Sequence, residues 1–74
     1  DGRIIFRDEN INNMITKLER IYDVIIINNN EKLNDQYINA TILTETESIE
    51  NVLDYLEEIY NLNYKIINNK IIIN

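Results

Sequence analysis

The chain has 74 residues and a formal net charge of −6, with thirteen acidic residues against seven lysines and arginines. This length allows one domain with a small core, and the negative charge disfavours nucleic acid and anionic membrane surfaces as partners. The sequence contains no cysteine and no histidine, which removes the usual transition-metal ligands, catalytic bases and thiol nucleophiles.

The chain begins with a predicted strand followed by a predicted helix. In the strand, residues 3–7, alternation places Ile4 and Phe6 toward the core. Asp8 is a suitable N-cap for a helix that runs from about Glu9 to Tyr22. Spacings of three and four give this helix one apolar face, made of Ile11, Met14, Ile15, Leu18, Ile21 and Tyr22.

The middle of the chain is predicted to hold two strands joined by a loop. In residues 24–28, Ile25 and Ile27 face outward because the alternate positions face the core. The polar stretch 28–35 is predicted to be a loop. Residues 36–44 form the next predicted strand, and its inward positions are Ile38, Ala40 and Ile42.

A second helix is predicted in residues 48–60, with Thr46 as its N-cap. Its apolar face repeats that of the first helix at a shift of 38 positions, as from Ile11 to Ile49. The repeat indicates internal duplication of a strand-helix-strand unit, although amphipathic helices also resemble one another by chance. We therefore expect one domain, residues 1–74, with pseudo-repeats at about 3–28 and 36–67 and a final strand at 70–74. The apolar face of the second helix consists of Ile49, Val52, Leu53, Leu56, Ile59 and Tyr60.

A β-hairpin is predicted to follow the second helix. Asn68-Asn69 suits a two-residue type I′ turn, because Asn tolerates positive φ. This turn sets Ile67 opposite Lys70, so Ile67 and Ile72 face outward. The inward face then carries Leu62, Tyr64, Ile66, Ile71 and Ile73.

Few side chains are able to carry out chemistry. Ser48 is the single serine and has no partner base, so a role at the start of the helix is favoured over catalysis. The acid pairs Glu57-Glu58 and Glu45/Glu47 leave a hydrolase or cation site as a remote alternative. Gly2 is the only glycine, which excludes a phosphate-binding loop. We expect no enzymatic activity, no cofactor and no metal.

Five segments carry a family pattern: Ile-Ile-Phe at 4–6, Leu-Glu-Arg-Ile-Tyr-Asp-Val at 18–24, residues 38–42, Ser-Ile-Glu-Asn-Val-Leu at 48–53, and Asn-Tyr-Lys-Ile-Ile-Asn-Asn-Lys-Ile-Ile-Ile at 63–73. Together they resemble the C-terminal periplasmic domain of FecR-type anti-sigma factors, in the form common in Bacteroidetes. The chain has Ala40 where that family often has Gly, and Asn10 where it often has Pro. Such domains are similar to the short N-terminal domain of secretins and TonB-dependent receptors, so that origin stays open.

The resemblance implies an α+β fold in the order β-α-β-β-α-β-β, with two helices between a two-stranded and a three-stranded sheet. It also implies a periplasmic domain of an inner-membrane-anchored protein, without membrane contact of its own. The implied partner is a protein, the periplasmic signalling domain of an outer-membrane transporter, whose state is relayed to a sigma factor.

Strand parity predicts a candidate partner-binding patch on the outer face of the three-stranded sheet. The patch consists of Ile25, Ile27, Ile67 and Ile72, and it forms if the second and fourth strands lie side by side. Single exposed isoleucines also occur without function, so a surface of no special role is an alternative. A free strand edge that accepts a strand from the partner is a second route.

Overall fold

The computed structural model describes residues 2–74 and contains two helices, five strands and one short 3₁₀ helix. The helices are twelve residues each. The elements follow the order predicted from the sequence, and the fold is α+β. In chain order they are β1 (Arg3–Asn10), α1 (Ile11–Tyr22), β2 (Ile25–Asn28), η1 (Glu31–Asp35), β3 (Tyr37–Leu43), α2 (Ile49–Tyr60), β4 (Tyr64–Ile67) and β5 (Lys70–Ile73).

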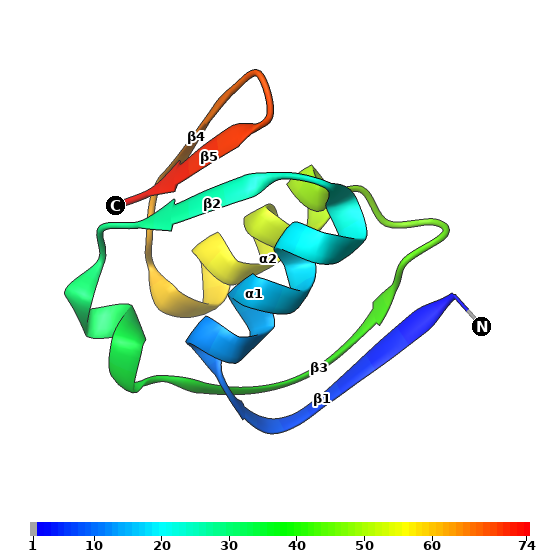
Figure 1. Ribbon diagram of the computed structural model, residues 1–74. Helices are drawn as coiled ribbons and strands as arrows, with labels where there is room; N and C mark the ends of the chain where they lie inside the picture. The colour runs from blue at the N-terminus through cyan, green and yellow to red at the C-terminus, as the bar shows by residue number, and fades with distance from the viewer. Residues whose placement is uncertain (1) are drawn as a thin grey trace.

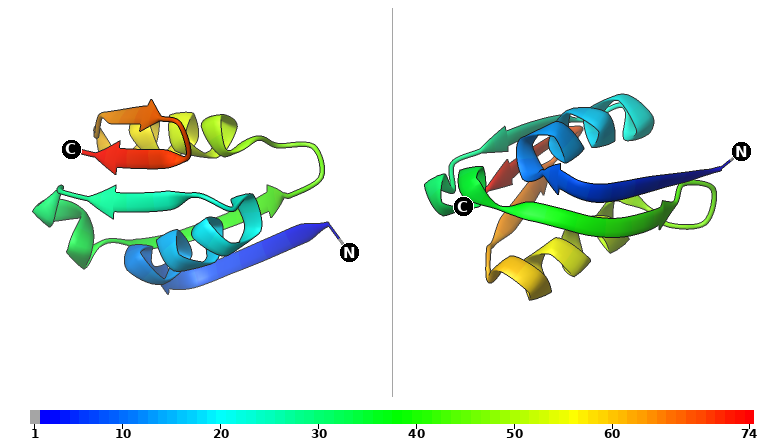
Figure 2. Two further views of the ribbon diagram at one scale, coloured as in Figure 1. Left: turned by 45° about the horizontal axis from the view of Figure 1, so that its top comes forward. Right: turned by 90° about the horizontal axis from the view of Figure 1, so that it is seen from below.

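The strands form two sheets with both helices between them (Figure 1). β1 and β3 make an antiparallel two-stranded sheet. The other sheet has the order β2-β5-β4, with β5 parallel to β2 and antiparallel to β4. The layers confirm the predicted arrangement. Figure 2 shows that β1 runs on the side of α1 and β3 on the side of α2.

The second and fourth strands are not neighbours, because β5 lies between them. β5 contributes Ile71 and Ile73, neither of which has exposed surface. This fits the central position of β5, because a central strand buries its inward residues more completely than an edge strand does. Ile66, on the edge strand β4, was predicted to face the core and is instead 39% exposed. The hairpin register itself is as predicted, with Ile67 opposite Lys70.

The core lies between the two sheets and takes one face of each helix. Two predicted core positions are wrong, since Ile21 is 36% exposed and Ile59 is 45% exposed. At this turn of each helix the neighbouring Tyr22 and Tyr60 pack against the core instead. The fully or nearly fully buried residues are Phe6, Ile11, Met14, Ile15, Leu18, Ile26, Leu33, Ile38, Ile42, Val52, Leu53, Leu56, Leu62, Ile71 and Ile73.

Helix α1 begins two residues later than predicted. Its N-cap is Asn10, whose Oδ1 accepts the Asn12 N–H at 2.8 Å. The predicted N-cap, Asp8, lies instead in an irregularity of β1 between Phe6 and Glu9, with φ at 46°. Pairing with β3 therefore carries the strand past Asp8, and this long-range contact overrides the local cap signal.

Helix α2 likewise begins after a later cap than predicted. Ser48 and Asn51 form a reciprocal capping box, in which each side chain accepts the backbone N–H of the other. Thr46, the predicted N-cap, belongs to a turn in which its N–H donates to the carbonyl of Leu43. Both helices end as predicted at left-handed residues, Asp23 and Asn61, with φ of 54° and 53°.

Two connections differ from the sequence-based expectation. The stretch predicted as a loop contains η1, which places Leu33 in the core at 1% exposure. The hairpin turn has positive φ at Asn68 but not at Asn69, whereas a type I′ turn requires it at both. The two-residue length alone therefore accounts for the register.

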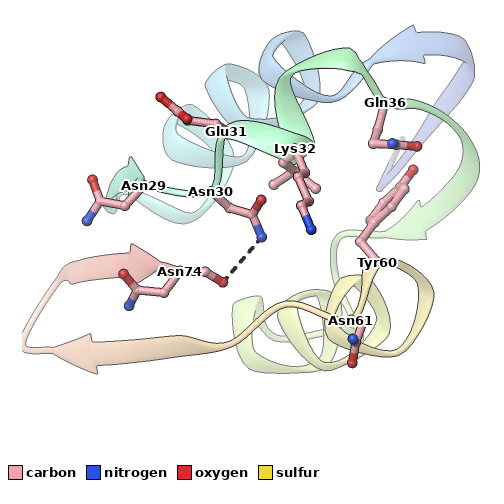
Figure 3. Close-up of a pocket in the computed structure, with 9 residues that line it drawn as sticks. Asn29, Asn30, Glu31, Lys32, Gln36, Tyr60, Asn61 and Asn74 are labelled. Atoms are coloured by element: carbon pink, nitrogen blue, oxygen red, sulfur yellow. Dashed lines mark hydrogen bonds between the residues drawn. The ribbon is translucent and has the colours of Figure 1, made fainter.

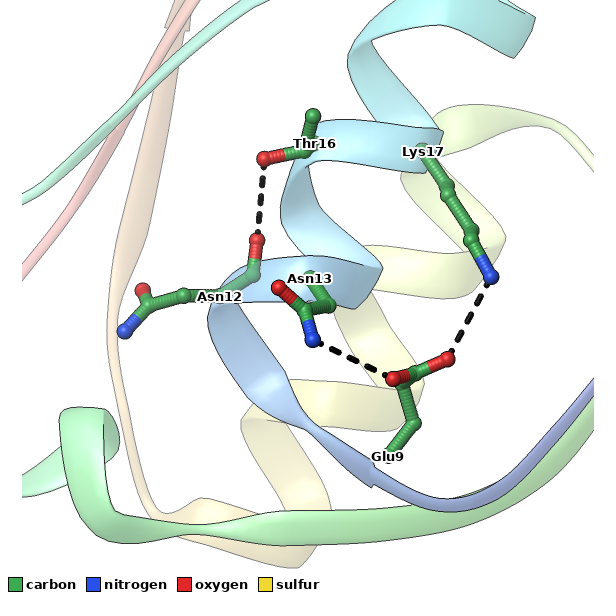
Figure 4. Close-up of polar contacts among 5 residues, drawn as sticks. All are labelled: Glu9, Asn12, Asn13, Thr16 and Lys17. Atoms are coloured by element: carbon green, nitrogen blue, oxygen red, sulfur yellow. Dashed lines mark hydrogen bonds and ion pairs between the residues drawn. The ribbon is translucent and has the colours of Figure 1, made fainter.

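The first turns of α1 carry an exposed polar cluster (Figure 4). The Glu9 carboxylate accepts hydrogen bonds from Asn13 Nδ2 at 3.2 Å and from Lys17 Nζ at 3.3 Å. These two bonds, that of Asn13 first, lower the pKa of Glu9. The Lys17 ammonium also lies 5.5 Å from the centre of the Phe6 ring. The cluster connects the end of β1 to α1, and its exposure makes the ion pair a minor contribution.

Candidate protein interface

The outer face of the three-stranded sheet carries the four isoleucines predicted from strand parity, but the condition given for the patch, adjacency of the second and fourth strands, is wrong because β5 lies between them. Ile25 and Ile67 both pair with Lys70, from opposite sides of the central strand. Ile27 lies beside Ile72 in the next row. Three of these isoleucines are exposed and Ile72 is half-buried, because it sits on the strand flanked on both sides. We call Ile25, Ile27, Ile67 and Ile72 the isoleucine face.

Two lysines lie among the residues of the isoleucine face and were not predicted from the sequence as part of this surface. Lys70 separates Ile25 from Ile67, and Lys65 flanks Ile72. Strand parity already predicts that both lysines face outward. Their position among the isoleucines depends on β5 being the central strand. β2, β4 and β5 contain no acidic residue. The face is thus apolar and positive on a chain of net charge −6.

A shallow polar concavity of about 640 Å³ lies between η1 and the end of α2 (Figure 3). Its lining consists largely of amides, and Asn30 Nδ2 donates to the backbone carbonyl of Asn74 at 3.3 Å. Tyr60 borders it, and its hydroxyl donates to the carbonyl of Tyr37 at 3.1 Å. The side chains of Asn30 and Tyr60 thus join segments of the chain.

A smaller concavity of about 230 Å³ lies between β3 and α2. Its lining mixes apolar side chains with one carboxylate, that of Glu47. We call it the β3–α2 groove, and it is lined by Ala40, Thr41, Ile42, Glu47, Val52 and Tyr55.

The polar side chains of Tyr64 and Ser48 make structural hydrogen bonds. The Tyr64 hydroxyl donates to Asp54 Oδ1 at 2.5 Å, and this hydrogen bond is the main reason why the pKa of Tyr64 rises to about 12. Ser48, the candidate nucleophile, caps α2 with its hydroxyl. In residues 2–74, no group of three or more His, Cys, Asp or Glu lies close enough together to hold a metal ion.

Neither α1 nor α2 is long and apolar enough to cross a membrane, and these are the two α-helices of residues 2–74.

Comparisons with known proteins agree on one family. The sequence profile described as "FecR, C-terminal" matches residues 3–73. Two crystal structures of a candidate anti-sigma factor from Parabacteroides distasonis are similar to the chain, with TM-scores of 0.84 and 0.82 and 25% sequence identity. They cover 99% and 97% of this chain, which in turn spans about a third of theirs, 34% and 33%. No curated protein matches the chain.

Proposed function

Since the chain belongs to the family of FecR C-terminal domains, we propose that it is the periplasmic protein-interaction domain of a FecR-like anti-sigma factor. In this role it receives the state of an outer-membrane TonB-dependent transporter and passes it toward a cytoplasmic sigma factor. The function is regulatory rather than enzymatic. The family match over residues 3–73 is the observation that carries the proposal, and the similarity to a candidate anti-sigma factor supports it.

The proposed partner is the periplasmic signalling domain of the transporter, and the proposed contact is the isoleucine face. Exposed fractions of 49%, 39% and 54% at Ile25, Ile27 and Ile67 leave apolar side chains on this face open to a partner. Lys65 and Lys70 add positive charge to this surface, so a partner surface with acidic residues around an apolar centre is complementary.

Replacement of isoleucines on this face tests the contact. A chain with Ile25→Thr, Ile27→Thr and Ile72→Thr is titrated against the signalling domain of the transporter encoded beside the parent gene, after circular dichroism has established folding. We expect affinity to fall by at least about tenfold, since apolar contacts at an interface centre dominate binding energy. Ile5→Thr is the matched control, because Ile5 is 46% exposed on the outer face of the other sheet. Unchanged affinity in the folded triple variant excludes the isoleucine face.

A receptor-appended or secretin-type short signalling domain is the alternative. The similarity to a candidate anti-sigma factor favours the first assignment. The full-length gene separates the two assignments: a FecR-like protein has a transmembrane helix upstream of this domain, and a receptor has a plug and barrel downstream of it.

A further inference from the structure

The edge of β3 that faces away from β1 has backbone groups available for pairing. The Thr44 N–H donates to the Gly2 carbonyl, and antiparallel ladders alternate hydrogen-bonded with non-hydrogen-bonded pairs. Leu43 and Thr41, opposite Arg3 and Ile5, therefore direct their backbone groups away from β1. At the other end of the strand the Ile11 N–H donates to the Gln36 carbonyl, which turns the groups of Tyr37 outward by the same alternation.

Backbone carbonyls at the two ends of this edge accept hydrogen bonds, whereas the backbone groups at its centre are free within the described part of the chain. The Tyr37 carbonyl accepts the Tyr60 hydroxyl, and the Leu43 carbonyl accepts the N–H groups of the following turn. Between them, the N–H groups of Asn39 and Thr41 donate to no turn, loop or side-chain group of residues 2–74, and their carbonyls accept from none. These free backbone groups form a stretch long enough to pair with a short added strand.

Two other exposed edges, those of β2 and β4, differ from this one. On β2 the Glu19 side chain reaches the edge and its Oε2 accepts the Ile26 N–H at 2.8 Å, which blocks an incoming strand. On β4 the groups of Tyr64 and Ile66 point outward, but neither concavity described above is lined by a β4 residue. The β3 edge alone among these three combines open backbone groups with an adjoining groove.

The β3–α2 groove lies beside the open stretch and is apolar at its base. Ile42 and Val52 are buried there, and Ala40, which is half-buried, leaves space because its side chain is a single methyl group. Tyr55 on the lining and Ile59 one turn later are 44% and 45% exposed. A strand added at this edge would direct alternate side chains toward this space, in the same sense as the inward residues of β3.

The two elements that form the groove, and the segment between them, contain charged side chains of one sign only. Residues 36–64, which include β3 and α2, hold six acids and no lysine or arginine, so this segment alone carries the −6 of the whole chain. Glu47 lines the groove itself. A segment that approaches this edge is therefore favoured when it is basic. The acids are Glu45, Glu47, Glu50, Asp54, Glu57 and Glu58, of which Glu50, Asp54 and Glu57 lie near Tyr64 of β4.

We propose that the free edge of β3 binds an extended, basic segment of a partner protein as an added strand, with one apolar side chain of that segment in the β3–α2 groove. Asn39 and Thr41 supply the backbone pairing, and Ala40, Val52 and Tyr55 surround the apolar side chain. This surface is separate from the isoleucine face and does not depend on the anti-sigma assignment.

A matched pair of proline variants tests the pairing. Thr41 and Ile5 face each other as one non-hydrogen-bonded pair, so each directs its N–H to a different outer edge. Thr41→Pro removes a donor of the β3 edge, and Ile5→Pro removes the equivalent donor of the β1 edge, while neither N–H is used inside the sheet. The probe is a fluorescein-labelled peptide, Lys-Val-Lys-Leu-Lys-Val-Lys, followed by fluorescence anisotropy at low salt.

We expect the wild-type domain and Ile5→Pro to bind this peptide equally, and Thr41→Pro to bind at least about tenfold more weakly, because main-chain pairing supplies the affinity in strand addition. The same peptide N-methylated at alternate amides, and a version with Glu for each Lys, are expected to lose binding to the wild type. Equal binding of the N-methylated peptide, or of Thr41→Pro in folded form, overturns the proposal.

A second set of variants is used if Thr41→Pro does not fold. Tyr55→Ala removes a groove side chain and Glu47→Gln removes its charge, and each is expected to weaken peptide binding without loss of circular dichroism signal. Amide chemical shifts in NMR provide the location, with the largest changes expected at Asn39 and Thr41. Changes centred on Lys65 and Lys70 instead, or absence of binding to the wild type with concentration-dependent self-association, count against a partner segment at this edge.

Discussion

Leu18 and Leu56 occupy equivalent places in the two helices, and neither has exposed side-chain surface. Leu18→Ala and Leu56→Ala are each expected to lower the free energy of unfolding by about 2–5 kcal/mol, because a cavity is left in a close-packed core. Ile21→Ala and Ile59→Ala, at the exposed equivalent positions, are the controls and are expected to cost less. Denaturant melts of the four variants measure the difference, and a loss under about half a kcal/mol at either leucine contradicts the assignment of the buried face.

Tyr64 provides a pH-dependent contribution to stability. Its folded pKa is raised to about 12, mainly by the hydrogen bond to Asp54, so the contribution is fully present below the ordinary tyrosine pKa of about 10 and is lost as pH rises through about 12. Tyr64→Phe is expected to be less stable than wild type near pH 8, with a difference that disappears above about pH 12. Urea melts across this range, with Tyr55→Phe as the control, test the dependence. A stability difference that stays constant with pH rules out the hydrogen bond as its cause.

At the scale of elements, strands and their register were accessible from sequence because they depend on local alternation and on the length of one turn. The pairing of Ile67 with Lys70 follows directly from the two residues between them. The starts of the helices were not accessible in the same way. Asp8 is a good cap in isolation, yet pairing of β1 with β3 continues to Asn10 and displaces the cap. Leu33 was missed because one apolar residue in a polar stretch has no periodicity.

The N-caps seen in the structure, Asn10 and Ser48, lead to a stability prediction that differs from the one for Asp8 and Thr46. Asn10→Ala and Ser48→Ala are each expected to reduce stability by about 1 kcal/mol, since each leaves an N–H of the first helical turn without its acceptor. Thr46→Ala is the comparison, because its hydroxyl makes only a long contact of 3.5 Å to the Leu43 carbonyl. Thermal melts at one pH rank the three. A larger loss of stability for Thr46→Ala than for Ser48→Ala would show that Thr46, and not Ser48, is the N-cap of α2.

At the scale of the molecule, one part of the candidate interface was predictable and the rest was not. Parity alone directs Ile25 and Ile27 outward, so the isoleucines could be named from sequence. Their arrangement around Lys70 required the strand order, which depends on a contact between segments far apart in the chain. The β3–α2 groove is likewise a product of packing between a strand and a helix, and no local pattern in Ala40 or Tyr55 indicates it.

The domain is expected to fold without metal. Its core consists of aliphatic and aromatic side chains from both helices and both sheets, which supplies the apolar burial that a small domain needs. Thermal unfolding with and without EDTA is expected to give the same midpoint. A fall of more than about 5 °C on chelation, which corresponds to roughly 1 kcal/mol for a domain of this size, contradicts the expectation.

The central position of β5 has a consequence for the order in which the domain is made. The partner of Ile25 in the sheet is Lys70, 45 positions later, and Ile71 and Ile73 seal the core from the same strand. A chain delivered from its N-terminus thus carries an unpaired β2 until residue 73 has emerged, so the domain completes its fold only once this last strand is available. A chain ended at Asn69 is expected to lack cooperative unfolding and dispersed NMR signals, and a synthetic peptide of residues 70–74 added to it is expected to restore them in part. If the shortened chain unfolds cooperatively by itself, the last strand is not required for the domain to fold.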